Sequence, residues 1–149
     1  MKLTKIMSVV LLLLFSVVRV GWCGGDDEAS VTLAASQQVY FNAVQAKDFA
    51  TAYDMVTENM RDGRTKEKYV EEWEDVMKSA QVDIVDGGVT AIHINGDKAR
   101  VHAWTKASDV FNAVPIIENE IDHWVLMGGV WKLDLTEVLM EEVNEIPTE

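Results

Sequence analysis

Apolar residues recur at helical spacing along the first half of the chain, with acidic and basic residues between them. Three segments follow this spacing: 30–46, 49–60 and 65–80. Asp48 stands before the second segment, where a helix needs an acceptor for its first free N–H groups. The first half of the chain therefore predicts three amphipathic helices, the second of them capped by Asp48.

From residue 81 onward the apolar residues alternate with polar ones, and β-branched and aromatic residues become frequent, which predicts strands. The expected strands are 82–85, 89–94, 99–106, 116–127 and 130–135. Asn95-Gly96 and Gly128-Gly129 favour tight hairpin turns. Pro115 cannot donate a hydrogen bond to a sheet, so we expect 110–114 to be an edge, a bulge or a loop.

Helices first and strands second predict an α+β fold, because amphipathic helices need the apolar face of a sheet to cover. We expect one domain over residues 30–135, preceded by a polar linker at 24–29. The acidic tail at 136–149 has apolar residues at spacings that favour a short amphipathic helix before Pro147.

The N-terminal residues 1–23 have the pattern of a signal peptide. Lys2 and Lys5 precede an apolar run at 6–18, and small residues follow it. An uncleaved anchor is the alternative, but the run is shorter than the roughly 20 residues that a spanning helix needs. We therefore expect an exported protein, periplasmic or secreted, that meets the membrane only during export.

Cys23, the one cysteine, lies at the end of this signal, so the rest of the chain has no internal disulfide. Its position is similar to that of the lipid-bearing cysteine of bacterial lipoproteins. That pattern wants a small residue directly before the cysteine, whereas Trp22 stands there. Lipid anchoring at Cys23 remains the alternative to a free exported domain.

The net charge of −12 restricts the partners of the protein. Removal of the signal takes away Lys2, Lys5 and Arg19 but no acidic residue, so the exported part is more acidic still. Binding to nucleic acid and to anionic lipid depends on basic residues that neutralise phosphate groups. The composition therefore predicts neither partner.

Two segments carry a resemblance to a known family. The first runs Ala43-Val-Gln-Ala-Lys-Asp48-Phe-Ala-Thr-Ala-Tyr53, and the second runs Trp124-Val-Leu-Met-Gly-Gly-Val-Trp131-Lys-Leu-Asp134. With the order of elements, they resemble the NTF2-like superfamily of cystatin-like α+β cones, in particular its small exported bacterial members of uncharacterised function. The resemblance implies a curved sheet wrapped around the helices, with a pocket at the open end of the cone. Isomerases, dehydratases, carriers and interacting proteins share this fold, so it implies no single function.

The candidate catalytic residues are His102, His123 and Asp134. A two-residue turn at Gly128-Gly129 places His123 opposite Asp134 on one sheet face and Trp124 opposite Leu133 on the other. A carboxylate beside an imidazole makes a general base. The alternative is a cross-strand surface ion pair, and Lys132 on the same face favours it.

His102 shares a face with His93 and Trp104 on the first hairpin, where it either lines a pocket or lies at the rim of the sheet.

Five aromatic residues are candidates for pocket walls, although aromatic residues at these spacings also build the core between helices and sheet. They are Tyr53, Trp73, Trp104, Trp124 and Trp131. The three histidines lack metal-ligand spacing, and the acidic residues form no calcium loop. We therefore expect no metal and no cofactor.

The sequence contains no phosphate loop, no nucleophile elbow and no other motif that names a reaction. We expect an exported, non-enzymatic module that binds a small apolar ligand in its cone. One alternative is an interaction or assembly domain, homodimeric or bound to another protein through 110–114 or the tail. An isomerase-like or dehydratase-like enzyme with His102 or His123 as its base is the least favoured reading.

Overall fold

A computed structural model of the protein describes residues 25–139. The expected signal peptide at 1–23 and the last ten residues of the expected tail, 140–149, lie outside the described residues. The described part consists of four helices followed by four strands, so the α+β prediction is confirmed.

The first helix, α1, spans Gly25–Gln45 and therefore begins inside the segment expected to be a linker. Asp48 caps α2, Phe49–Met55, as predicted: its carboxylate accepts from the backbone N–H of Thr51 at 3.1 Å and from the Thr51 hydroxyl at 2.7 Å. These two bonds hold the pKa of Asp48 below its usual range.

The segment expected to be one second helix is interrupted after α2 by an extended residue, Val56. Val56 forms an isolated parallel bridge with Leu133, and the N–H of Thr57 donates to the Leu133 carbonyl at 2.9 Å. A short helix, α3, follows at Glu58–Arg61, and α4 spans Lys66–Ser79, close to the predicted 65–80.

The strands form one antiparallel sheet in the order β1-β2-β3-β4, the meander that hairpin connections predict. Their bounds are Asp83–Asn95 for β1, Lys98–Ser108 for β2, Ile116–Met127 for β3 and Val130–Leu139 for β4. Residues 110–114 lie in the loop 109–115 between β2 and β3, in agreement with the expectation from Pro115. The expected helix of the tail is wrong for residues 136–139, which continue β4.

One strand, β1, replaces the two that alternation predicted at 82–85 and 89–94. The intervening Gly87 and Gly88 stay in the strand because their missing side chains leave room for aromatic rings. Phe41 of α1 lies against Gly87 on one face, and Trp104 of β2 lies against Gly88 on the other. Register shifts on both sides of the pair mark β-bulges.

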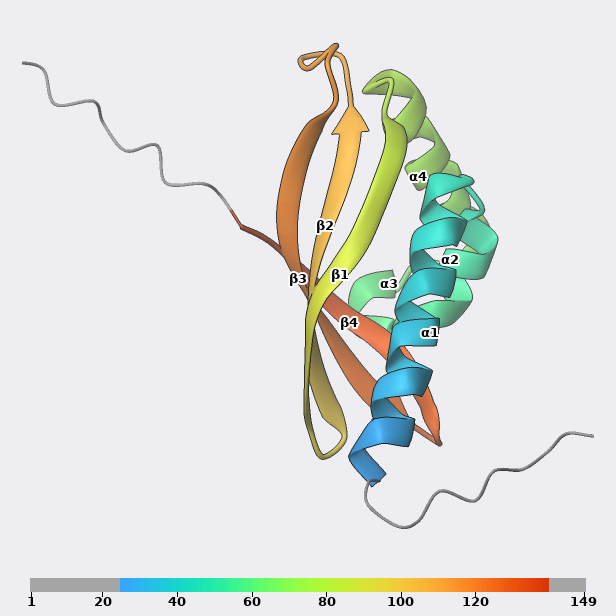
Figure 1. The fold of residues 1–149 in the computed structure, drawn as a ribbon. Helices are drawn as coiled ribbons and strands as arrows, with labels where there is room; N and C mark the ends of the chain where they lie inside the picture. The colour runs from blue at the N-terminus through green and yellow to red at the C-terminus, as the bar shows by residue number, and fades with distance from the viewer. Residues whose placement is uncertain (1–24, 140–149) are drawn as a thin grey trace, which may run out of the picture.

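The helices cover one face of the strongly twisted sheet, with α1 alongside β1, and no described element covers the other face (Figure 1). The core between helices and sheet is apolar and closely packed. It contains Leu33, Val56, Ala99, Val101, Trp124, Trp131 and Leu133. We call the uncovered side the outer face of the sheet.

Candidate functional site

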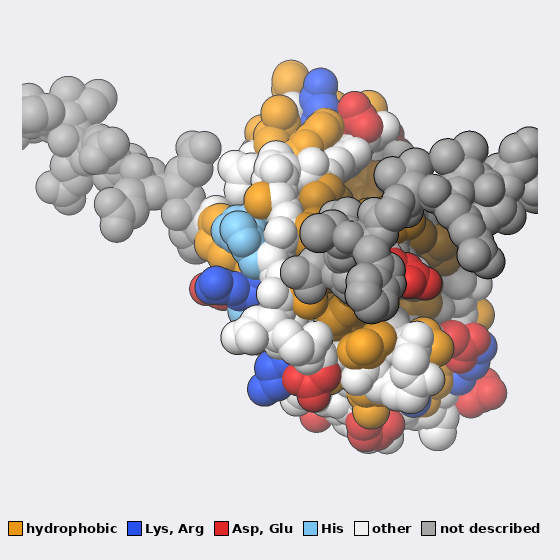
Figure 2. All heavy atoms as spheres, turned by 60° about the horizontal axis from the view of Figure 1, so that its bottom comes forward, with side chains coloured by type: hydrophobic (Ala, Val, Ile, Leu, Met, Phe, Trp, Pro, Cys, Tyr) orange, Lys and Arg blue, Asp and Glu red, His pale blue; other side chains and the backbone are white. Residues whose placement is uncertain are grey.

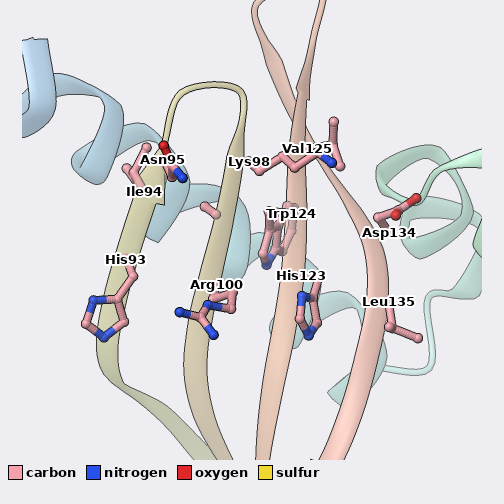
Figure 3. A pocket seen from close by; sticks show the side chains of 11 residues that line it. His93, Ile94, Asn95, Lys98, Arg100, His123, Trp124, Val125, Asp134 and Leu135 are labelled. Atoms are coloured by element: carbon pink, nitrogen blue, oxygen red, sulfur yellow. The ribbon is translucent and has the colours of Figure 1, made fainter.

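A hollow of about 430 Å³ lies on the outer face, near the turn between β1 and β2 and the turn between β3 and β4. It crosses the strands between two rows of outward residues (Figure 3). One row contains Asn95, Lys98 and Val125, and the other contains His93, Arg100, His123 and Leu135. Ile94, Ala99 and Trp124 lie between the rows, and because the side chains of Ala99 and Trp124 are buried in the core, backbone forms the floor.

The second row, which we call the basic row, is set by strand register. His93 is the partner of Arg100, Arg100 is the partner of His123, and His123 is the partner of Leu135. Directly paired residues of antiparallel strands point to the same face, with neighbouring strands about 4.8 Å apart. Figure 3 shows these side chains side by side across the four strands.

All three histidines of the chain lie on this face. The ring of His93 packs edge-on against that of His102, with centroids 5.5 Å apart. The Nε2 atom of His123 lies 3.4 Å from a carboxylate oxygen of Glu137. Figure 2 views the molecule from the end that carries the β1–β2 and β3–β4 turns, and there histidine side chains lie beside Lys or Arg side chains on one side of the surface.

The predicted pairing of His123 with Asp134 is wrong. Trp124 lies opposite Leu133 as predicted, but a bulge beside His123 then adds one residue to β4, so His123 faces Leu135. Asp134 is that extra residue, and its carboxylate accepts from the Thr57 hydroxyl at 2.6 Å. Both His123 and Asp134 line the hollow, but they do not form a dyad.

The five aromatic candidates do not gather around one cavity. Trp124 and Trp131 are buried in the core, and Trp104 lies on the outer face against Gly88. Trp73 stacks on Phe49 between α4 and α2, with ring centroids 6.1 Å apart. The hydroxyl of Tyr53 donates to the Arg64 carbonyl at 3.1 Å, and the Arg61 guanidinium lies over its ring.

The inner face of the sheet contains a buried polar network that the sequence analysis missed. Asp122, 2% exposed, accepts from Gln37 Nε2 and from the Thr136 hydroxyl, each at 2.6 Å. Gln37 in turn accepts from the indole N–H of Trp124 at 2.7 Å. Each residue of this hydrogen-bond network has a partner, as buried polar groups require.

Glu120 lies beside this network and accepts from the Thr105 hydroxyl at 3.1 Å. Burial, with the nearby Asp122 carboxylate, raises the pKa of Glu120 to about 7. Burial likewise raises the pKa of Asp122. A carboxyl that gains and loses its proton near neutrality suits acid–base chemistry. However, the hollow that Glu120 borders measures about 10 Å³, enough for roughly one water molecule.

Sequence reasoning missed the basic row because it placed the first hairpin turn at Asn95-Gly96. The turn residues are Gly96 and Asp97, and Asn95 pairs with Lys98. With that register the sequence alone places Arg100 beside His93. The buried carboxylates gave no such signal, since a strand with acids at alternate positions also describes a solvent-exposed face.

Within residues 25–139 no three histidine, cysteine or acidic residues are placed to hold a metal ion. Among the helices of that part, none is both long enough and apolar enough to cross a membrane.

No family model and no curated protein matches the chain. Solved structures do match. An NTF2-like protein of unknown function from Pseudomonas putida KT2440 is 14% identical, with a TM-score of 0.59, over 77% of this chain and 88% of that one. A ketosteroid isomerase-like protein from Erwinia carotovora atroseptica SCRI1043 is 16% identical, with a TM-score of 0.55, over 77% and 98%. A protein of unknown function with a cystatin-like fold from Nostoc punctiforme PCC 73102 is 11% identical, with a TM-score of 0.55, over 73% and 88%.

Proposed function

Because this chain has the NTF2-like fold, which by itself names no activity, we propose a function from the hollow on the outer face: the protein is an exported, non-enzymatic module that binds a small ligand on that face of its sheet. The observation that carries this proposal is a hollow of ligand size on which the side chains of His93, Arg100 and His123 converge. Its volume of about 430 Å³ falls within the roughly 300–1,000 Å³ of small-molecule sites.

The lining of the hollow supports the proposal. Val125 and Leu135 supply apolar contact, while Arg100, His93 and His123 supply a few polar groups that converge from neighbouring strands. Such a mixture binds the apolar part of a ligand and fixes its orientation. The site therefore differs from the interior cone pocket that the sequence analysis expected, where the hollow beside Glu120 admits no ligand of this size.

A neutral fluorescent probe, N-phenyl-1-naphthylamine, tests the proposal by titration into the purified protein. We expect saturable binding that Leu135→Trp weakens, because a bulky ring in the basic row fills the hollow. Val138→Trp is the matched control, since Val138 is an equally exposed residue of β4 that points to the inner face opposite Glu120. Weakening by Val138→Trp alone would place the ligand in the cone, and absence of any binding would contradict the proposal.

The loop between β2 and β3 favours a second candidate function, docking of another protein or of a second copy. Its Phe111 is 90% exposed and its Val114 is 78% exposed, which is unusual for large apolar side chains. Phe111→Asp should abolish any concentration-dependent association seen by analytical ultracentrifugation while probe binding continues. A wild-type protein that stays monomeric would remove the case for a second copy.

A further inference from the structure

We propose that the ligand of the outer hollow is an amphipathic anion, whose carboxylate or phosphate head group is bound by Arg100 between His93 and His123. This inference rests on the proposed function, because it names the chemistry of the ligand at the same site. The inference goes beyond the proposed function because it adds recognition of an anionic head group, which a site for a purely apolar ligand does not need.

The charge of the hollow is opposite to that of the protein. The chain carries a net charge of −12, yet three neighbouring positions of the basic row are an arginine and two histidines, with Lys98 in the adjacent row. Close groups dominate the potential at a site, because salt screens exposed charges beyond about 8–10 Å. A cationic spot on an acidic surface therefore attracts anions locally.

Arg100 differs in its contacts from Arg61 and Arg64, the other two arginines among the described residues. On the helical side Arg61, Arg64, Lys66 and Lys68 each lie within ion-pair distance of a carboxylate. Within the described residues Arg100 has no such carboxylate. Its planar guanidinium presents parallel N–H donors that fit the two oxygens of a carboxylate or phosphate.

The two acidic groups near the hollow each contact a residue other than Arg100. The Asp134 carboxylate accepts from Thr57 of the segment before α3, and in Figure 3 its side chain points away from Arg100. Glu137 contacts His123, which leaves Arg100 as the central cation of the row. The half-exposed Leu135 at the end of the row and Val125 across the floor are placed to contact an apolar body.

Protonation of the row should strengthen anion binding. His93, His102 and His123 each gain a positive charge on protonation, and the other charged groups that line the hollow or contact these rings are Lys98, Arg100, Asp134 and Glu137. Lys132, the partner of Val125, adds a further positive charge at the edge of the hollow. Three imidazoles outnumber the two carboxylates, so protonation of the histidines makes the row more cationic. We therefore expect an anion to bind more tightly at acidic pH than at alkaline pH, because each histidine gains a positive charge on protonation.

The test compares ligands that share an apolar tail, titrated by calorimetry into the purified full chain. Octanoate and octyl phosphate carry an anionic head group, whereas 1-octanol does not. We expect the better anion to bind about tenfold or more tightly than 1-octanol, the effect of a charge-assisted bidentate pair. The ranking of octanoate and octyl phosphate assigns the head group to a carboxylate or to a phosphate.

Two variants separate local recognition from general charge. Arg100→Gln should lower the affinity for the anion to that for 1-octanol, without changing the affinity for 1-octanol. Lys78→Gln removes one positive charge from the exposed end of α4 and should leave both affinities unchanged. Equal losses in the two variants would overturn the proposal. If Arg100→Gln does not fold, as judged by circular dichroism, Arg100→Lys replaces it and should retain only part of the preference.

The outcomes distinguish this inference from the proposed function. Equal affinities for octanoate, octyl phosphate and 1-octanol would overturn the inference while the hollow remained a ligand site. Failure of all three to bind, together with failure of the neutral probe, would overturn both. Octyl sulfate, which stays charged at both acidic and alkaline pH, tests the pH dependence. An affinity that does not change with pH, or changes equally in His93→Gln/His123→Gln, would remove the histidines from the site.

Discussion

Gly87 shows how one residue allows α1 to approach the sheet. A methyl group at this position would meet the ring of Phe41, so α1 and β1 can lie this close only because the side chain is missing. We expect Gly87→Ala to lower the free energy of unfolding by about 1–3 kcal/mol, the usual cost of overpacking. Urea unfolding of the wild type and of Gly87→Ala measures this difference in the free energy of unfolding.

A double variant provides the control for this prediction. Phe41→Leu removes the ring, so adding Gly87→Ala to Phe41→Leu should cost less than Gly87→Ala alone. Equal costs in the two backgrounds would mean that Phe41 is not the obstacle.

The raised pKa of the single residue Glu120 makes the stability of the fold depend on pH. Its pKa is raised from 4.5 to about 7 in the folded protein, so the stability it contributes is complete below pH 4.5 and is lost as the pH rises through 7. Glu120→Gln removes the group that ionises. At about pH 8 it should therefore be more stable than the wild type by about 1–3 kcal/mol.

Thermal unfolding at two pH values measures this effect. The advantage of Glu120→Gln should shrink toward zero near pH 4.5, where the wild-type carboxyl is protonated too. The exposed Glu118→Gln on the same strand is the control and should show little advantage at either pH. An advantage of Glu120→Gln that is equal at both pH values would contradict a raised pKa.

At the scale of elements, the loop after β2 is ordered by one carboxylate. Asp109 accepts from the backbone N–H groups of Phe111 and Asn112 at 2.7 and 2.8 Å, and these bonds hold its pKa below the usual range. The exposed Phe111 is therefore presented by a preorganised turn.

Hydrogen exchange tests this role of Asp109. Asp109→Ala should speed exchange of the Phe111 and Asn112 amides by about tenfold or more, while the amides of β2 keep their protection. Asp83→Ala, at the exposed start of β1, is a matched control. Unchanged exchange at Phe111 would show that the turn does not depend on the carboxylate.

Patterns with a local cause were predictable from the sequence, and patterns with a tertiary cause were not. The helices, the meander and the cap at Asp48 follow from periodicity and hydrogen bonding within a few residues. The bulge beside His123 lies where β4 contacts Thr57, the residue before α3, through Leu133 and Asp134, and no local pattern encodes this contact. For the same reason the sequence placed His123 in the candidate site but gave it the wrong partner.

At the scale of the whole molecule, the sheet has two different faces. The inner face carries the apolar core and a satisfied polar network, while the outer face carries the histidines, Arg100 and half-exposed apolar residues. Such a sheet can change its outer residues without loss of the core, because alternate side chains along a strand serve different faces. A binding function on this side is thus separable from stability.

The bridge between Val56 and Leu133 has a consequence for self-assembly. β4 is the last strand of the sheet, and an edge strand offers unpaired backbone groups on which the strands of other chains can add. The extended Val56 and the N–H of Thr57 occupy the start of that edge at Leu133. We therefore expect the break between α2 and α3 to hinder intermolecular strand addition at this part of the β4 edge.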